Sequence, residues 1–86
     1  MRIFYTTRFL RKFKKIPNEL KEIIRERSDI FQNNVFDSRL KTHKLKGPLS
    51  GKLSFSITSD YRIMFEFLDN KKDVLFIDVG NHSIYK

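Results

Sequence analysis

The sequence contains no cysteine, only three glycines and two prolines, and no long apolar run. Without cysteine, disulfide frameworks, thiolate nucleophiles and cysteine-based zinc or iron–sulfur sites are excluded. No apolar stretch approaches the ~20 residues that span a bilayer, and the first five residues lead into charge rather than into an apolar signal core. We therefore expect a cytoplasmic protein with no membrane partner.

Common catalytic motifs are also missing. The chain has no phosphate loop of the GxxxxGK[ST] or GxGxxG type and no HExxH motif. Its two histidines cannot form a three-histidine zinc site, so we expect neither a metal nor a cofactor. A catalytic triad can be written with Ser83, His43 and Asp60, but the sequence around the serine lacks the nucleophile elbow.

Positive charge is what the sequence has in excess. Its 86 residues carry 18 Lys and Arg against 10 Asp and Glu, a net charge of +8. Nine basic and three acidic residues lie in 1–27, and residues 39–52 hold five basic residues and no acid. The length allows one domain, residues 1–86, and a small basic domain most often binds nucleic acid, an anionic membrane or an acidic protein. The alternative is a solvated basic surface without a ligand.

Residue periodicity predicts an α+β fold of order β-α-α-β-β-β. Alternating apolar residues predict strands at 1–6, 53–58, 61–68 and 73–79, and helical spacing predicts helices at 8–15 and 17–32. We expect an antiparallel sheet with a helical hairpin packed on one face.

Local signals place the ends of these elements. Thr6 or Thr7 is the candidate N-cap of the first helix, and Pro17 suits the first turn of the second. Asn33 and Asn34 can stop that helix, because Asn tolerates the left-handed conformation. The second face of the sheet is expected to be open, since it would carry Ser54, Ser56 and Arg62, and residues 35–51 form a long, basic connection.

Cations, imidazoles and phenols gather in the second half of the chain, and they suit cleavage of RNA without a metal. A base must take the proton of the 2′-hydroxyl, cations stabilise the charged phosphorane, and an acid protonates the leaving 5′-oxygen. An imidazole, with an ordinary pKa of ~6.5, can do either proton transfer, and Arg and Lys bind phosphate. The candidates are His43, Lys44, Lys46, Lys52, Arg62, His82 and Tyr85. Taken singly, each also has a structural interpretation, and Tyr61 fits the core better than base stacking.

Four segments, in order, carry a resemblance to a known family. They are FLRKFKKIP at 9–17, HKLKGPLSG at 43–51, ITSDYRIMF at 57–65 and IDVGNHSIY at 77–85. Together they resemble the toxins of the RelE/ParE superfamily, in its YafQ-like and RelE-like RNase branch. The match covers nearly the whole chain.

The resemblance implies a microbial RNase-like fold and a type II toxin that is silenced by a cognate antitoxin. It also implies that the toxin enters the ribosome and cuts mRNA there as an endoribonuclease, leaving a 2′,3′-cyclic phosphate. The positions that match the family's catalytic residues are His43, Asp60, Arg62, His82 and Tyr85. We assign RNA or phosphate binding to Lys44, Lys46, Lys52 and Tyr61. The cations expected to hold ribosomal RNA from the first helix are Arg8, Arg11, Lys12 and Lys15.

Two departures from the family pattern leave alternatives open. Ser56 stands where YafQ-like members have a second histidine, and Asp78 stands where they carry an arginine. A relative that lacks these groups can instead be a gyrase-poisoning toxin of the ParE type without RNase activity, or a catalytically weak partner-binding protein. Fold alone does not decide between these targets.

Overall fold

A computed structural model describes residues 1–85 as a five-stranded sheet with two α-helices and three short 3₁₀ helices. The strands are β1 (Ile3–Tyr5), β2 (His43–Lys44), β3 (Leu53–Ser56), β4 (Arg62–Phe67) and β5 (Val74–Gly80). The α-helices are α1 (Thr7–Lys14) and α2 (Asn18–Asn33), and the 3₁₀ helices are η1 (Ser38–Leu40), η2 (Gly47–Leu49) and η3 (His82–Tyr85). Each predicted strand and helix is therefore present, with bounds that differ by at most two residues.

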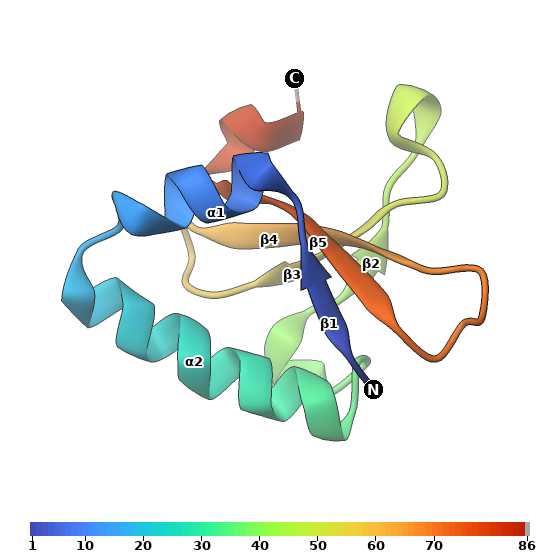
Figure 1. The fold of residues 1–86 in the computed structure, drawn as a ribbon, viewed down its shortest axis with the longest axis horizontal. Helices are drawn as coiled ribbons and strands as arrows, with labels where there is room; N and C mark the ends of the chain where they lie inside the picture. Colours follow the sequence, from blue (N-terminus) through green and yellow to red (C-terminus); the bar gives the residue numbers. More distant parts are fainter. Residues whose placement is uncertain (86) are drawn as a thin grey trace.

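The sheet has the order β1-β5-β4-β3-β2, and it is mixed rather than antiparallel (Figure 1). β3, β4 and β5 form the expected antiparallel meander, but β1 pairs with β5 in parallel. The expectation of an all-antiparallel sheet was wrong because β1 and β5 are not joined by a hairpin. The whole chain between them separates the two strands, so their relative direction was open. β2, inside the segment expected to be a connection, adds a fifth strand beside β3.

The helix starts follow the local signals, whereas the end of α2 does not. Thr6 is the N-cap of α1, and its Oγ1 accepts a hydrogen bond from the Phe9 N–H at 3.0 Å. Pro17 is the N-cap of α2 rather than part of its first turn. Asn34 ends α2 in an extended conformation (φ −159°), so the left-handed stop is wrong. The left-handed residue lies further on, at Lys41 (φ 52°).

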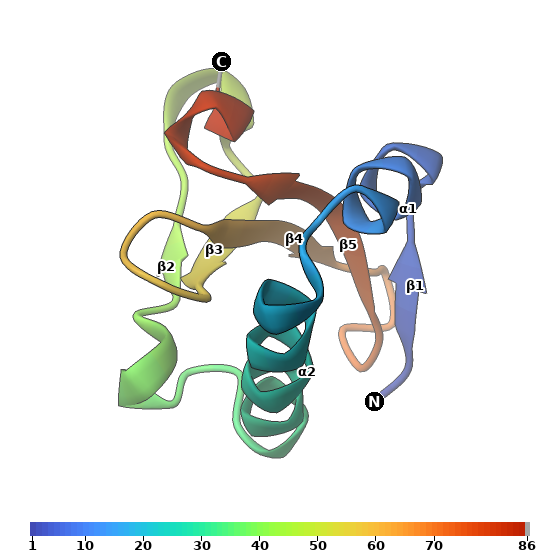
Figure 2. The same ribbon diagram turned by 90° about the vertical axis from the view of Figure 1, so that its left-hand side faces the viewer.

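The core lies between α2 and one face of the sheet (Figure 2). Phe31 of α2 is fully buried there. Its ring centroid lies 4.7 Å from that of Phe55 on β3 and 4.9 Å from that of Phe65 on β4. Alternation along the strands directs these side chains inward and leaves the intervening residues for the second face.

The second face of the sheet is partly closed, which corrects the expectation that it is open. Ser54 and Met64 are paired across β3 and β4 on this face, and both are buried. Ile84 of η3 is also buried, and a Cβ atom added at Gly80 would lie only 2.9 Å from its Cγ2 atom. η3 therefore folds back against the second face and covers it beside β4.

A bulge in β5 places Asp78 on the same face. Phe76 pairs with Phe65 and Asp78 pairs with Met64, so Ile77 is an extra residue in β5. The extra residue reverses the alternation, which sends Val79 into the core and Asp78 to the opposite face. Sequence alternation alone would have placed Asp78 with Phe76.

Candidate active site

Arg62, at the start of β4, holds a cation beside the C-terminal turn. Its Nη2 donates a hydrogen bond to the carbonyl oxygen of Ser59 at 3.2 Å, and its Cζ atom lies 5.8 Å from the centroid of the Tyr85 ring. Its Nε is buried and has no hydrogen-bond partner among residues 1–85. A buried guanidinium N–H without an acceptor is uncommon, and an anion bound there would satisfy it.

His43 lies on the same face of the sheet as Arg62. His43 pairs with Ser54 and Arg62 pairs with Ser56, and residues two apart on a strand share a face. The imidazole Nδ1 lies 3.0 Å from the carbonyl oxygen of Lys41. Since a carbonyl only accepts hydrogen bonds, Nδ1 carries the proton in this contact, and Nε2 of the neutral ring is left to accept a proton.

These two residues belong to a larger concave surface, the basic hollow. It has a volume of about 580 Å³, and its charged or imidazole side chains are Arg27, Arg39, Lys41, His43 and Arg62. Its floor is formed by the end of β3 and by the turn that follows, residues 56–59. Four cations therefore surround one concavity whose described lining contains no acid.

One nearby acid does act on the basic hollow. Asp37 accepts hydrogen bonds from Nη2 and the backbone N–H of Arg39, both at 2.9 Å. The side-chain and then the backbone hydrogen bonds from Arg39 lower the pKa of Asp37 to about 2. Arg39 is thus the partly neutralised member of the hollow, whereas Arg27, Lys41 and Arg62 form no ion pair with a carboxylate within residues 1–85.

η3 brings the last two predicted catalytic residues to the edge of this surface. The rings of His82 and Tyr85 meet edge-to-face with their centroids 5.8 Å apart. The Tyr85 hydroxyl and the Oγ of Ser54 are 2.6 Å apart and share a hydrogen bond. Since that hydroxyl is engaged, the ring rather than the hydroxyl is the free part of Tyr85.

Asp60 and His82 line a second hollow, together with Ser59, Tyr61 and Asn81. Their side chains share no hydrogen bond in the described part of the chain. Ser59 contributes to both hollows, so all five predicted catalytic residues lie around the β3–β4 turn and η3. Tyr61 is half-buried and packs against the core, as its pattern indicated, while part of it also lines the second hollow.

The predicted phosphate-binding lysines are not brought to one place. Lys46 lies near Tyr85, because both line a small apolar hollow with Leu45 and η2. Lys44 pairs with Leu53, which faces the core, so it is directed to the face opposite to His43. Lys52 lines neither the basic hollow nor the second one.

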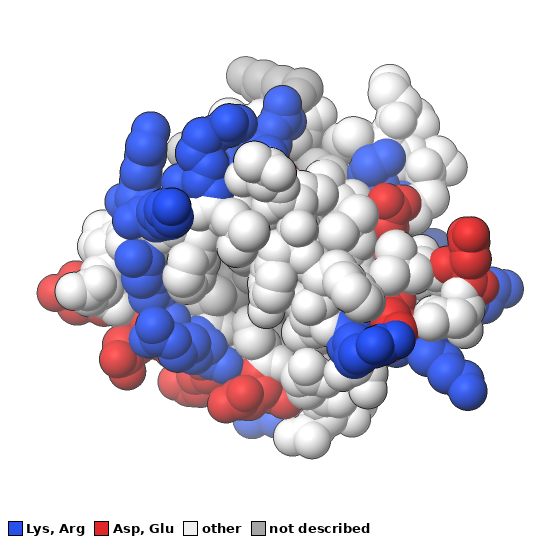
Figure 3. All heavy atoms as spheres, in the orientation of Figure 1, with Lys and Arg blue, Asp and Glu red and all other residues white. Residues whose placement is uncertain are grey.

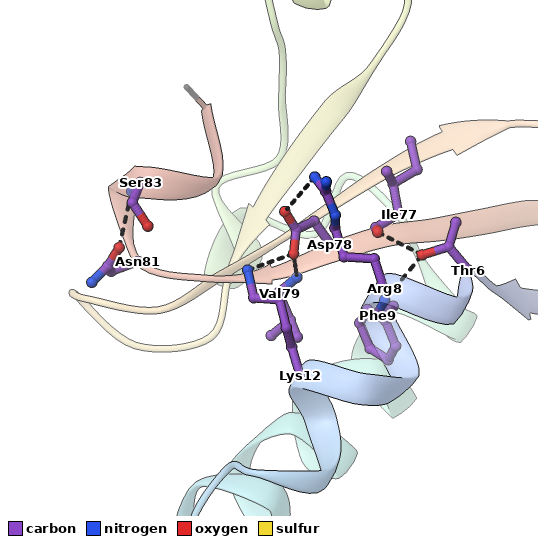
Figure 4. Close-up of polar contacts among 9 residues, drawn as sticks. All are labelled: Thr6, Arg8, Phe9, Lys12, Ile77, Asp78, Val79, Asn81 and Ser83. Atoms are coloured by element: carbon purple, nitrogen blue, oxygen red, sulfur yellow. Dashed lines mark hydrogen bonds and ion pairs between the residues drawn. The ribbon is translucent and has the colours of Figure 1, made fainter.

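The basic residues of α1 have two different surroundings. Lys12 Nζ lies 2.6 Å from Oδ1 of Asp78 and Arg8 Nη1 lies 3.9 Å from Oδ2, as Figure 4 shows. Asp78 is only 4% exposed, so this pair ties α1 to β5. Arg11 and Lys15 are exposed, and in Figure 3 Lys and Arg side chains gather over α1 while acids lie over α2.

Sequence reasoning missed three residues of the basic hollow: Arg27, Arg39 and Lys41. The acid-free run at 39–52 contained two of them, so a signal for Arg39 and Lys41 was present. Arg27 gave no signal, since only the packing of α2 brings it beside η1.

Two further searches of the described residues bear on function. Among residues 1–85, no three His, Asp or Glu side chains gather as a metal site would require. None of the helices in that range is both long and apolar enough to cross a bilayer.

The fold and the site together define a small α+β domain with an imidazole beside several unpaired cations. Its fold is that of the RelE/ParE-type toxins. A YoeB/ParE toxin from Agrobacterium tumefaciens has a TM-score of 0.80 at 19% identity, covering 95% of this chain and 99% of that one. YafQ from E. coli strain BL21(DE3) has a TM-score of 0.79 at 18% identity, covering 99% and 98%.

An archaeal RelE in complex with RelB, from Pyrococcus horikoshii OT3, has a TM-score of 0.75 at 15% identity, covering 93% of this chain and 92% of that one. No protein-family model and no curated protein matches the chain. The fold that the four motifs predicted is therefore confirmed by similarity to structures that share only 15–19% of their sequence with this chain.

Proposed function

We propose that this protein is the toxin of a type II toxin–antitoxin system, a single-domain cytoplasmic endoribonuclease that cleaves mRNA on the ribosome and thereby inhibits translation. The observation that carries the proposal is that His43 and Arg62 lie on one face of the sheet and line the same basic hollow. One offers a free imidazole nitrogen, and the other a buried guanidinium N–H that lacks an acceptor. A base beside an unsatisfied anion site is what metal-independent cleavage of RNA requires.

In this mechanism His43 is the base. Nε2 takes the proton of the 2′-hydroxyl, and the resulting imidazolium keeps its Nδ1–H bond to the carbonyl of Lys41. That carbonyl therefore stabilises the charge that the ring gains. The oxygen attacks the adjacent phosphorus, and the positive charge of the Arg62 guanidinium stabilises the phosphorane.

We assign His82 as the acid, since its ring meets the Tyr85 ring, beside which the Arg62 guanidinium lies. It protonates the 5′-oxygen as the P–O bond breaks, leaving a 2′,3′-cyclic phosphate on the upstream RNA. Asp60 lines the same hollow as His82 but, within the described residues, does not hydrogen-bond to it, and its proposed role is to orient the imidazole once RNA is bound. The Tyr85 ring stacks on a base, because single-stranded RNA is held mainly by such stacking.

The ordinary partner of such a toxin is an antitoxin. Similar folds have been solved as the E. coli DinJ–YafQ toxin–antitoxin complex and as the YoeB–YefM complex from Staphylococcus aureus. We propose that a cognate antitoxin with acidic and apolar residues covers part of His43–Lys46, Arg62 and His82. The exposed Arg11 and Lys15 of α1 are proposed to hold ribosomal RNA.

The test is induced expression followed by mapping of mRNA 5′ ends and of the chemistry of the cut ends. His82→Ala should abolish growth arrest, because loss of one proton donor costs about 10²–10⁴-fold in rate. Arg62→Ala should abolish it as well, because it removes the cation that stabilises the phosphorane. Arg25→Ala is the matched control, since Arg25 is an exposed arginine of α2 whose carboxylate partner is Glu22 at 3.7 Å. Double-stranded DNA breaks with intact mRNA would instead show a gyrase-poisoning toxin. If both variants are soluble and still arrest growth, Arg62 and His82 are not catalytic.

A further inference from the structure

Arg27 is a second arginine in the basic hollow with a buried N–H that nothing satisfies. Its Nε is buried without a partner within residues 1–85, as is that of Arg62. Its Nη1 makes one long contact, 3.4 Å, with the carbonyl oxygen of Arg39. Two unpaired guanidinium donors in one concavity are unusual, because buried donors are nearly always paired in folded proteins.

The two arginines approach the hollow from different sides. Arg62 begins β4 and has its guanidinium over the Tyr85 ring. Arg27 comes from α2 and reaches the part of the chain formed by η1 and its C-cap, where Arg39 and Lys41 lie. The contact of His43 with the Lys41 carbonyl joins these two parts. The hollow therefore has two cationic ends, one from β4 and one from α2 and η1, and an imidazole that contacts the second.

The left-handed conformation of Lys41 shapes this junction. A non-glycine residue with φ 52° is strained, and such strain persists where the surroundings hold it. Here it places the Lys41 carbonyl against His43 in a hollow that the Lys41 side chain also lines. The backbone conformation of Lys41 thus links His43, the proposed base, to the cations at the α2 and η1 end of the basic hollow.

From this geometry we infer that Arg27, Arg39 and Lys41 form a second phosphate subsite, which holds an unreacted internucleotide phosphate next to the one that is cleaved. The inference rests on the proposed function, since Arg62 and His43 define the reacting phosphate. A single RNA strand carries the repeated, linked phosphates that two cationic ends of one hollow can bind together. The subsite makes a strand with two neighbouring phosphates a better ligand than a dinucleotide with one.

The test compares two uncleavable probes, a 2′-O-methyl RNA dinucleotide with one phosphate and a 2′-O-methyl trinucleotide with two. Arg27→Gln should weaken trinucleotide binding roughly tenfold to hundredfold, the usual size of a charged hydrogen bond, and leave dinucleotide binding unchanged. The slope of log affinity against log salt should fall by about 0.7 for the trinucleotide alone, as expected for one phosphate of a single strand. Arg25→Gln, the same change of charge on the same helix, should alter neither probe.

A direct readout is the NMR signal of the Arg27 Nε–H group. Addition of the trinucleotide should shift it, and addition of the dinucleotide should shift only the Arg62 signal. The melting temperature of Arg27→Gln distinguishes a structural role of Arg27 from a role in binding phosphate. If the variant melts at a lower temperature but binds the trinucleotide as tightly as wild type does, Arg27 is structural and the subsite is wrong. Tighter binding of a pentaglutamate peptide than of the trinucleotide would also overturn it, and would show that the hollow takes carboxylates.

Failure of the subsite and failure of the proposed function give different results. If Arg62→Ala and His43→Ala abolish cleavage while Arg27→Gln binds both probes normally, the subsite is wrong and the nuclease stands. If no variant or wild-type protein cuts mRNA but trinucleotide binding depends on Arg27, the phosphate subsite stands and the cleavage mechanism is wrong.

Discussion

The hydrogen bond between Tyr85 and Ser54 allows a sharp prediction, because one of its ends is almost fully buried. Ser54 is 1% exposed, and its Oγ lies 2.6 Å from the Tyr85 hydroxyl. Tyr85→Phe removes only that hydroxyl and leaves the serine without this partner. An unmade buried hydrogen bond costs about 1–3 kcal/mol, so the melting temperature should fall by at least about 4 °C for a domain of this size.

A double-mutant cycle isolates the contact. Ser54→Ala leaves the Tyr85 hydroxyl, which is only half-buried and can bind water, so this change should cost less than Tyr85→Phe. The double variant leaves neither group unpaired. Its loss of unfolding free energy, measured by urea denaturation followed by circular dichroism, should be smaller than the sum of the two single losses by about 1 kcal/mol.

The same variant separates two roles of Tyr85 in the proposed cleavage of RNA. Because the hydroxyl is engaged by Ser54, Tyr85→Phe should keep the stacking ring and lose less than about tenfold in cleavage rate, well below the loss expected for a proton donor. Tyr85→Ala should lose much more, since it removes the ring beside Arg62. An unchanged melting temperature together with a hundredfold slower Tyr85→Phe enzyme would refute the reasoning, because the hydroxyl would then be free to act on RNA.

Three further predictions test the fold and its charges. Phe31→Ala should lose about 3–5 kcal/mol of unfolding free energy in a denaturant titration, because the ring is fully buried against the Phe residues of the sheet. Lys12→Met should lose about 1–3 kcal/mol in the same titration, since it leaves the distant Arg8 as the remaining cation beside the buried Asp78, and a variant that also carries Asp78→Asn should recover part of the loss. The pKa of Asp37 is lowered from 3.8 to about 2, so its contact with Arg39 stabilises the fold above pH 3.8 and loses that effect as the pH falls through 2. The difference in melting temperature between wild type and Asp37→Asn should therefore shrink over that window, and a constant difference would contradict the assignment.

Elements set by neighbouring residues could be predicted from the sequence. The Thr6 cap, the stripe on α2 and the three strands of the meander follow from spacing within a few residues, which is why they agree with the structure. The same holds for Arg62, whose strand position places it at the β3–β4 turn. Local signals suffice there because no distant segment alters the result.

Features that depend on distant segments could not be predicted. Burial of Ser54 needs η3 to return across the sheet, and the orientation of Asp78 needs a bulge that no local pattern announces. Arg27 reaches the basic hollow only because α2 ends beside η1. The candidate site thus combines residues that sequence motifs identify as functional candidates with others, such as Arg27, that only tertiary packing brings to the site.

The parallel pairing of β1 with β5 has a consequence for how the protein is made. The Arg2 N–H donates to Oδ1 of Asp73 at 2.9 Å, and Ile3 lies beside Val74 across an interval of about seventy residues. During synthesis from the N-terminus, the first strand to leave the ribosome has no partner until the last of the five strands follows. The nascent chain therefore cannot close its sheet before β5 has emerged, and since η3 follows β5, the second face of the sheet stays uncovered until the same stage.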